Sequence, residues 1–130
     1  MQIRYGDLDP QWHVNNSRAL TFIEQARFDY LRKLELWDGQ DFFKIGLIVA
    51  DVHVAYLAPM YLGQSIEVRL RVARMGNKSL TFEYEMVDMQ TEEVLTRADT
   101  IMVSYDYVQK TSMPIPDAWR KAIGAFEGME

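Results

Sequence analysis

The longest regular pattern in the chain is a run of apolar residues at helical spacing. Between Arg18 and about Leu36, apolar side chains recur three and four positions apart, and further apolar residues spread around the remaining faces. A helix that is apolar on most of its faces is usually buried on most of its faces. Residues 15–17 (NNS), which favour helix N-caps, come directly before this run. The pattern therefore predicts one long, largely buried helix over residues 18–36, ended by the turn residues 37–39 (WDG).

Beyond that helix the period of the pattern changes to two, which is typical of strands with one apolar face. Gly76-Asn77 separates two alternating runs and favours a tight hairpin, and residues 90–93 indicate a second turn. The four long strands predicted from this alternation cover residues 48–58, 65–75, 80–86 and 94–107.

Shorter elements flank these strands. Residues 2–5 predict a short first strand, residues 114–116 (PIP) stop the sheet, and Asp117 is a candidate cap for a short final helix over residues 118–125. The order is then a strand, a long helix, four strands in a meander and a short helix. A meander implies an antiparallel sheet with one apolar face. We therefore predict an α+β hotdog fold, in which an antiparallel sheet of about five strands wraps around one long central helix.

Composition narrows the range of functions. The chain is 48% hydrophobic and 25% charged, which is typical of a globular protein, and we expect a single domain over residues 1–130. Because there is no cysteine, disulfides, cysteine-ligated zinc, iron–sulfur clusters and cysteine nucleophiles are excluded; two histidines make a metal site unexpected. The net charge of −5 disfavours nucleic acid as a partner. No apolar run approaches the ~18–20 residues of a membrane span and no signal peptide opens the chain, so we expect a cytoplasmic protein.

Residues 4–16 (RYGDLDPQWHVNN) carry the most specific pattern in the sequence. They resemble the start of the 4-hydroxybenzoyl-CoA thioesterase-like branch of the hotdog superfamily. In that family a short strand leads into Asp-x-Asp, often Gly-His-Val-Asn-Asn, and a helix with Glu-x-Ala-Arg, here residues 24–27. Trp12 departs from the pattern, because many members carry glycine there. The resemblance covers nearly the whole chain and continues through residues 56–59 (YLAP), 76–79 (GNKS), 97–98 (RA) and 114–116 (PIP).

The resemblance implies hydrolysis of acyl-CoA thioesters, with coenzyme A as part of the substrate and no further cofactor. It places the catalytic carboxylate at Asp9 and an oxyanion-binding backbone N–H at Asn16. A thioester carbonyl is electrophilic, so its hydrolysis needs a base that activates water or a carboxylate nucleophile, and both roles stay open for Asp9. From the local pattern alone, Asp9 is equally typical of an Asx-turn, and Asn15 and Asn16 of helix caps.

Further polar residues have less defined roles. His13 is a third catalytic candidate, which orients or tunes the catalytic carboxylate, although a lone loop histidine is more often structural. Glu24 faces the same pocket as a second carboxylate, or it pairs with Arg27 at i+3. Asp7 is expected in a surface loop, and His53 is expected on a strand as a structural or pocket-lining residue.

Coenzyme A also needs contacts for its phosphates. The resemblance places these contacts around the turn after residue 75, and two cations lie next to that turn. Arg69 and Arg71 share a face of the preceding strand, where they either bind phosphate or form a solvated surface. The predicted nucleotide contacts are Arg74, Asn77, Lys78 and Ser79. The candidate contacts for the acyl group, all of which are also typical of plain core, are Trp12, Phe22, Tyr56, Met60 and Tyr61.

An open sheet edge favours dimerisation. The resemblance implies a homodimer, commonly paired again into a homotetramer, in which Asp9 of one subunit works with binding groups of its neighbour. Two other functions stay open at this point. One is a non-catalytic acyl-CoA or lipid binder, suggested by the unusual Trp12. The other is a hotdog hydratase or dehydratase, although those relatives usually pair an Asp with a His in a differently placed segment.

Overall fold

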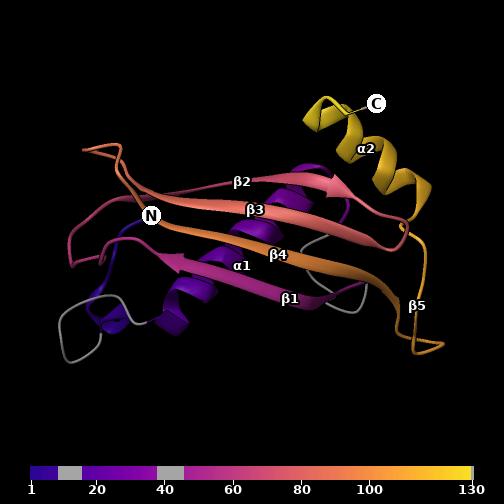
Figure 1. Ribbon diagram of the computed structural model, residues 1–130, viewed down its shortest axis with the longest axis horizontal. Helices are drawn as coiled ribbons and strands as arrows, with labels where there is room; N and C mark the ends of the chain where they lie inside the picture. Colours follow the sequence, from indigo (N-terminus) through magenta and orange to yellow (C-terminus); the bar gives the residue numbers. More distant parts are fainter. Residues whose placement is uncertain (9–15, 38–45, 130) are drawn as a thin grey trace.

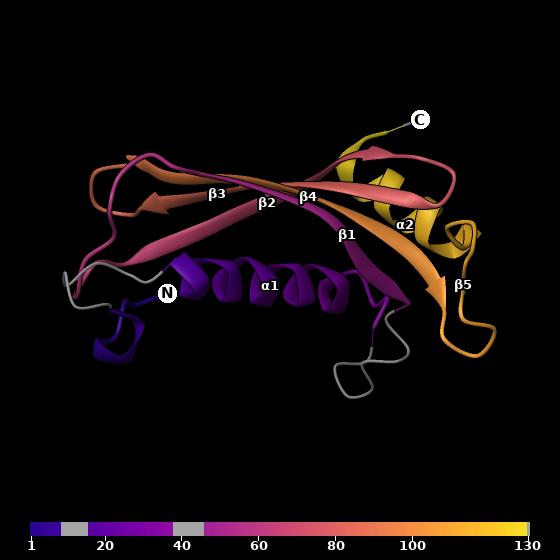
Figure 2. The same ribbon diagram turned by 60° about the horizontal axis from the view of Figure 1, so that its bottom comes forward.

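The computed structural model describes residues 1–8, 16–37 and 46–129. One long helix lies across one face of a twisted antiparallel sheet, and a short C-terminal helix lies near one end of the sheet (Figures 1 and 2). This is the hotdog arrangement predicted from the sequence. The elements in chain order are the 3-10 helix η1 (Tyr5–Asp7), α1 (Asn16–Lys33), β1 (Leu47–Tyr56), β2 (Ile66–Met75), β3 (Ser79–Asp88), β4 (Val94–Asp106), β5 (Thr111–Ser112) and α2 (Asp117–Glu127).

The strands lie side by side in the order β1-β4-β3-β2, and all neighbours are antiparallel. Both predicted hairpins are confirmed, since β2 pairs with β3 and β3 with β4. The meander prediction is wrong for β1, which pairs with β4 and not with β2. The connection from β1 to β2 is too long for a tight hairpin. Its first residues, Leu57 and Ala58, donate their N–H groups to the Leu95 carbonyl as the chain crosses the start of β4. β1 and β2 therefore form opposite edges of the sheet.

The end of α1 also differs from the prediction, because the helix stops at Lys33 instead of about Leu36. Glu35 adopts a left-handed conformation, with φ of 60°. The N–H of Leu36 bonds to the Leu31 carbonyl (2.9 Å), and the N–H of Glu35 bonds to the Arg32 carbonyl (3.0 Å). These two bonds make a Schellman motif, so the backbone itself ends the helix before the expected turn.

Two short elements differ from expectation as well. Residues 2–5 do not form the predicted strand: Gln2 makes only an isolated bridge with Ser65, and η1 begins at Tyr5. The fifth strand is instead β5, which pairs with the end of β4. The final helix begins with Asp117 as its first residue, so Asp117 is not its cap; Pro116 holds that position.

The core lies between α1 and the inner face of the sheet. Every second residue of β3, from Leu80 to Met86, is almost completely buried, as the period of two predicted. The Tyr30 ring of α1 meets the Phe82 ring of β3 edge-on, with centroids 5.7 Å apart. This packing fixes the direction of α1 across the strands. The buried residues that α1 contributes are Ala19, Phe22, Ile23, Arg27, Tyr30 and Leu31.

Candidate active site

The first turn of α1 lies at the end of the sheet where β1 ends and β2 begins (Figures 1 and 2). Because α1 begins at Asn16, the N–H of Asn16 and of the residues just after it have no carbonyl partner within the helix. The helix dipole adds to their attraction for an anion. The start of α1 at Asn16 makes such donors available, and the oxyanion role of the Asn16 N–H stays a prediction. Asp9, Trp12 and His13 lie outside the described residues, and their roles stay predictions too.

Asp7 lies against this turn and is only 1% exposed, so its predicted place in a surface loop is wrong. Its Oδ2 accepts a hydrogen bond from the Arg4 backbone N–H (2.9 Å), and the Arg4 Nε lies 3.6 Å away. Its Oδ1 lies 3.4 Å from Nε of Arg18, in the first turn of α1, as an ion pair without hydrogen-bond geometry. Two cations thus neutralise a buried carboxylate, which is the condition for its stability.

Sequence reasoning missed this pair, although the chain contains a signal for it. The dipole of a helix disfavours a cation in its first turn. Arg18 occupies that position without an acidic residue in the first turn of α1. Such a cation indicates a carboxylate from another segment.

The predicted nucleotide contacts lie at the opposite end of the sheet. The turn between β2 and β3 lies near α2, and Arg120 of α2 donates to the backbone carbonyl of Asn77 (2.8 Å) (Figures 1 and 2). The N–H of Ser104 donates to the Lys78 carbonyl (2.8 Å), which ties the turn to β4. The structure therefore brings the predicted contacts together at one turn but separates them, within one chain, from the start of α1. The side chains at this turn are exposed or partly buried: Arg74, Asn77, Lys78 and Ser79.

Tyr56 is the last residue of β1 and lies at the same end of the sheet as the start of α1. It pairs with the buried Thr96, so its ring faces the helix side, where it is 44% exposed. Partial burial raises the pKa of its phenol. The other described candidates for acyl contacts differ in exposure. Phe22 and Met60 are buried core residues, and Tyr61 is exposed.

The edge strand β1 exposes apolar side chains on the helix side of the sheet. A β-bulge between Val49 and Asp51 shifts the register, so that Val49 and Val52 both face that side. Val49 is 48% exposed and Val52 is 42% exposed. An apolar, unpaired edge is a surface to which another strand readily adds.

A buried cation lies next to this edge. Arg27 is 7% exposed; its Nη1 donates to the Tyr84 hydroxyl (3.3 Å), which also shares a hydrogen bond with Thr100 Oγ1 (3.0 Å). Among the residues that the structure describes, no ion pair joins Arg27 to the exposed Glu24, so the predicted i,i+3 pair is wrong. Glu24, Arg27 and Val49 line a small cavity of about 230 Å³. Glu24 therefore lines a cavity, and this cavity lies beside the edge strand β1.

A larger groove of about 630 Å³ runs between α1 and β2, and Phe22, Val68 and Phe126 are among its lining residues. Tyr30 forms part of its wall. The Tyr30 hydroxyl is buried and has no hydrogen-bond partner within the described ranges. Burial and the nearby Glu127 carboxylate raise the pKa of this phenol, which therefore stays neutral.

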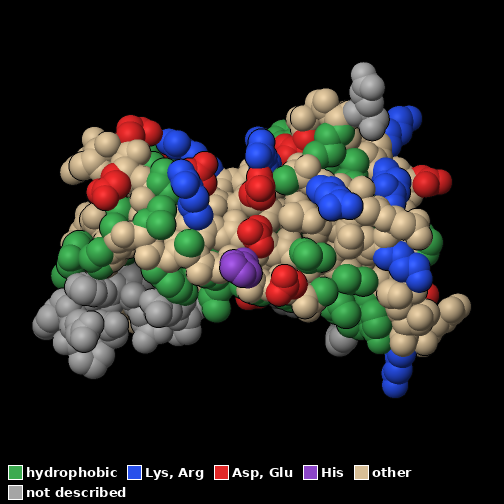
Figure 3. All heavy atoms as spheres, in the orientation of Figure 1, with side chains coloured by type: hydrophobic (Ala, Val, Ile, Leu, Met, Phe, Trp, Pro, Cys, Tyr) green, Lys and Arg blue, Asp and Glu red, His purple; other side chains and the backbone are tan. Residues whose placement is uncertain are grey.

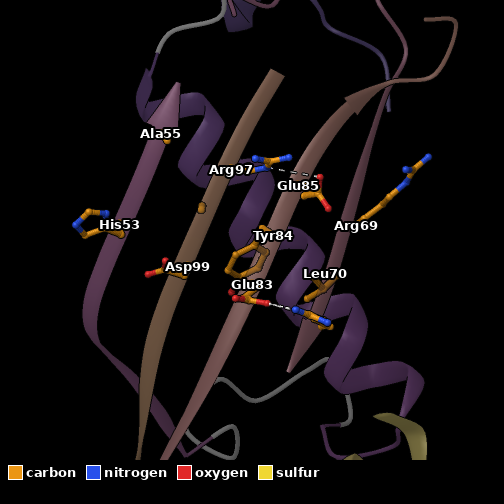
Figure 4. Close-up of a pocket in the computed structure, with 11 residues that line it drawn as sticks. His53, Ala55, Arg69, Leu70, Glu83, Tyr84, Glu85, Arg97 and Asp99 are labelled. Carbon is orange, nitrogen blue, oxygen red and sulfur yellow. Dashed lines mark hydrogen bonds and ion pairs between the residues drawn. The ribbon is translucent and has the colours of Figure 1, made fainter. Parts of the chain in front are cut away.

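The outer face of the sheet, away from α1, carries charged side chains of both signs (Figure 3). They cluster around a hollow of about 590 Å³, and Figure 4 shows α1 on the far side of the strands that line it. His53 lines this hollow, as a pocket-lining residue. Arg71 pairs with Glu83 (2.7 Å), and Arg97 lies 3.8 Å from Glu85.

Arg69 belongs to the same face and binds two carboxylates, Glu67 (2.6 Å) and Glu92 (3.0 Å). Hydrogen bonds to Glu67 and then Glu92 raise the pKa of its guanidinium. Since Arg69 and Arg71 are both neutralised and point away from α1, the structure favours a solvated surface over phosphate binding for this pair.

Within residues 1–8, 16–37 and 46–129, no three His, Cys, Asp or Glu side chains gather as a metal ion would require. In the same ranges, no helix has the length and apolar character needed to cross a membrane.

Similarity to known proteins assigns this chain to a family. Long-chain acyl-CoA thioesterase FadM of Escherichia coli K12 is 28% identical over 79 residues, which cover 61% of this chain and 60% of FadM. Acyl-CoA thioester hydrolase YbgC of Escherichia coli O6:H1 is 24% identical over 118 residues, covering 89% of this chain and 87% of YbgC. The match thus spans less than two thirds of FadM but most of YbgC.

Among solved structures, a thioesterase from Thermus thermophilus complexed with coenzyme A and Zn shares the fold, with a TM-score of 0.87 and 30% sequence identity. The superposition covers 100% of this chain and 93% of that one. The sequence profile described as the Thioesterase-like superfamily matches residues 3–123. This match confirms the family predicted from residues 4–16, and the chain belongs to the Thioesterase-like superfamily.

Proposed function

We propose that this protein hydrolyses acyl-CoA thioesters to a free acid and coenzyme A. Membership of the Thioesterase-like superfamily supports the reaction class. The observation that carries the proposal is the start of α1. Its first-turn N–H groups have no intrahelical partner, and they follow directly on the segment that contains Asp9.

In the proposed reaction, the thioester carbonyl oxygen accepts a hydrogen bond from the backbone N–H of Asn16. Asp9 either takes a proton from water as that water attacks the carbonyl carbon, or attacks the carbon itself to form an anhydride that water then hydrolyses. In both routes the carbon–sulfur bond breaks, and the leaving coenzyme A thiolate takes up a proton. His13 orients Asp9. In other enzymes the loss of one oxyanion donor costs about 3–4 kcal/mol of transition-state stabilisation.

The working unit in this proposal is a homodimer formed through β1, and dimers pair again into a tetramer. The exposed apolar residues Val49, Val52 and Tyr56 on β1, an edge strand of the described sheet, support the dimer. Two copies of one edge strand pair antiparallel about a two-fold axis, because such an interface uses the same surface twice.

In this proposal, the same two-fold symmetry brings the start of α1 and the turn that carries Lys78 to one end of the joined sheet. β2 is ten residues long, so the turn that carries Lys78 and the start of α1 are on the order of 30 Å apart along the strands of one chain. Antiparallel pairing of β1 reverses the partner's sheet. Each α1 start then lies at the same end of the joined sheet as the other chain's turn, where Arg74 and Lys78 supply charge for the coenzyme A phosphates.

A panel of acyl-CoA substrates with detection of the released thiol tests the proposal. We expect turnover by the wild-type protein and a large loss of kcat in Asp9→Asn, with little change in the stability of the fold. Undiminished turnover in Asp9→Asn would remove Asp9 from its role. Tight acyl-CoA binding without thiol release from any substrate would favour the alternative, a non-catalytic acyl-CoA binder, for which Trp12 in the loop is the supporting sequence feature.

A further inference from the structure

An ion pair between a buried carboxylate and a partly exposed cation joins the two segments that flank residues 9–15. Asp7 ends η1, and Arg18 lies in the first turn of α1. The Asp7 Oδ1 and the Arg18 Nε are 3.4 Å apart, and Asp7 is 1% exposed while the Arg18 side chain is 44% exposed. A pair of this kind holds the start of α1 in a fixed relation to η1.

The segment before Asp7 is itself held to the sheet. Ile3 is 3% exposed within the core, and its N–H bonds to the Gln64 carbonyl (3.1 Å) just before β2. Leu8, which follows Asp7, packs against the same core. Asp7 therefore lies between two residues that are anchored in the core, and its contact with Arg18 links the first turn of α1 to this anchored segment.

Electrostatics strengthens this link. The helix dipole disfavours the Arg18 cation in the first turn, and burial disfavours the Asp7 carboxylate, so each charge offsets the cost of the other. If Asp7 were neutral, Arg18 would be released. The first turn of α1 would then lose its contact with η1.

We propose that Asp7 and Arg18 are positioning residues for thioester hydrolysis. They hold the start of α1, with the N–H groups proposed to bind the oxyanion, in a fixed relation to η1, which leads along the chain into the segment that carries Asp9. This inference rests on the proposed function. It adds two residues that act through others and do not themselves touch the substrate.

Steady-state kinetics of four variants tests the inference: Asp7→Asn, Arg18→Gln, the double variant and Arg18→Lys. Because a misplacement of about 1 Å at a reacting centre costs on the order of 100-fold in rate, we expect Asp7→Asn and Arg18→Gln each to lower kcat by about 10–100-fold. KM should change by less than about twofold, since substrate binding is left intact. The double variant should be no slower than the slower single variant, because both changes break one contact. Arg18→Lys keeps the charge and should recover most of kcat.

A matched control separates positioning from general loss of an ion pair. Arg71 and Glu83 form a pair of 2.7 Å on the outer face of the sheet, so Arg71→Gln and Glu83→Gln should leave kcat unchanged. Thermal unfolding of every variant shows which of them are folded. If Asp7→Asn fails to fold, Arg18→Gln decides the matter, because the Arg18 side chain is 44% exposed and its replacement does not by itself open the core.

The outcomes distinguish the two proposals. A folded wild-type protein without turnover on any acyl-CoA refutes the proposed function and this inference with it. An active wild type and an inactive Asp9→Asn, combined with a folded Arg18→Gln whose kcat and KM are both normal, overturns this inference alone. A fall in kcat that tracks the loss of thermal stability equally in all variants, the control pair included, also overturns it.

Discussion

Replacement of Val52 by lysine should dissociate the proposed dimer. Val52 lies on the edge strand β1 and is 42% exposed on the helix side of the sheet. Full burial of a valine side chain contributes about 2 kcal/mol, so the exposed part corresponds to about 0.8 kcal/mol per protomer and about 1.7 kcal/mol for two symmetric copies. Loss of this term raises the dimer Kd at least about tenfold, before the cost of placing two ammonium groups at the interface.

Sedimentation velocity over a wide range of protein concentration measures this change directly. Val108→Lys is the matched control, because Val108 is 91% exposed in the connection between β4 and β5 and is not part of strand β1. We expect Val108→Lys to dimerise like the wild type. Hydrolysis by Val52→Lys should fall with its dimer fraction and recover at high protein concentration, since the proposed site takes groups from both chains.

Equal dissociation constants for the wild type and Val52→Lys would refute a dimer formed through β1. A wild-type protein that is monomeric at every concentration yet hydrolyses acyl-CoA would refute it as well. In the second case, Arg74 and Lys78 of the same chain would have to reach the substrate, contrary to their place at the far end of the sheet.

Three further variants probe other parts of the structure. Tyr30→Phe should stabilise the fold by about 1 kcal/mol in denaturant unfolding, because it removes a buried hydroxyl without a described partner and keeps the ring; a loss of stability would mean that this hydroxyl is bonded. Phe82→Ala should cost about 3–4 kcal/mol in the same measurement, since Phe82 is 0% exposed, and a cost below about 1 kcal/mol would contradict its place in the core. The double variant Arg74→Gln/Lys78→Gln should raise KM for acyl-CoA several-fold, leave kcat unchanged and weaken the dependence of KM on salt. The control Lys110→Gln should leave KM and its salt dependence unchanged. An equal KM in the double variant and the control would remove the turn from phosphate binding.

Much of the fold follows from short-range pattern in the sequence. The turn at Gly76-Asn77 lies between two runs of period two, and a tight turn leaves the chain one way to continue, so the β2–β3 pair was predictable. The pairing of β1 with β4 was not predictable in this way. A connection as long as residues 57–65 permits either neighbour, and only the packing of the whole sheet selects β4. The bulge between Val49 and Asp51 likewise breaks the period that the prediction relied on.

The candidate site shows the same difference between features set by neighbouring residues and features set by distant ones. The resemblance placed the nucleotide contacts at one turn, and the structure keeps these residues together because they are adjacent in the chain; their role stays a prediction. The polar and turn-forming neighbours of Asp7 predict an exposed loop residue, whereas its burial depends on Arg18 and on the helix that carries Arg18. Local pattern identifies candidate groups, but which of them become buried partners is decided by contacts between distant segments.

The same distinction explains why a single chain does not contain the whole proposed site. The α1 start and the 76–79 turn are fixed at opposite ends of the sheet by strand length, which no side-chain adjustment alters. A substrate with a thioester at one end and phosphates at the other therefore requires either a fold that brings the two ends together or a second copy that reverses one of them. The apolar edge of β1 offers the second solution, and so the exposure of Val49 and Val52 is as much a part of the functional argument as the carboxylate at Asp9.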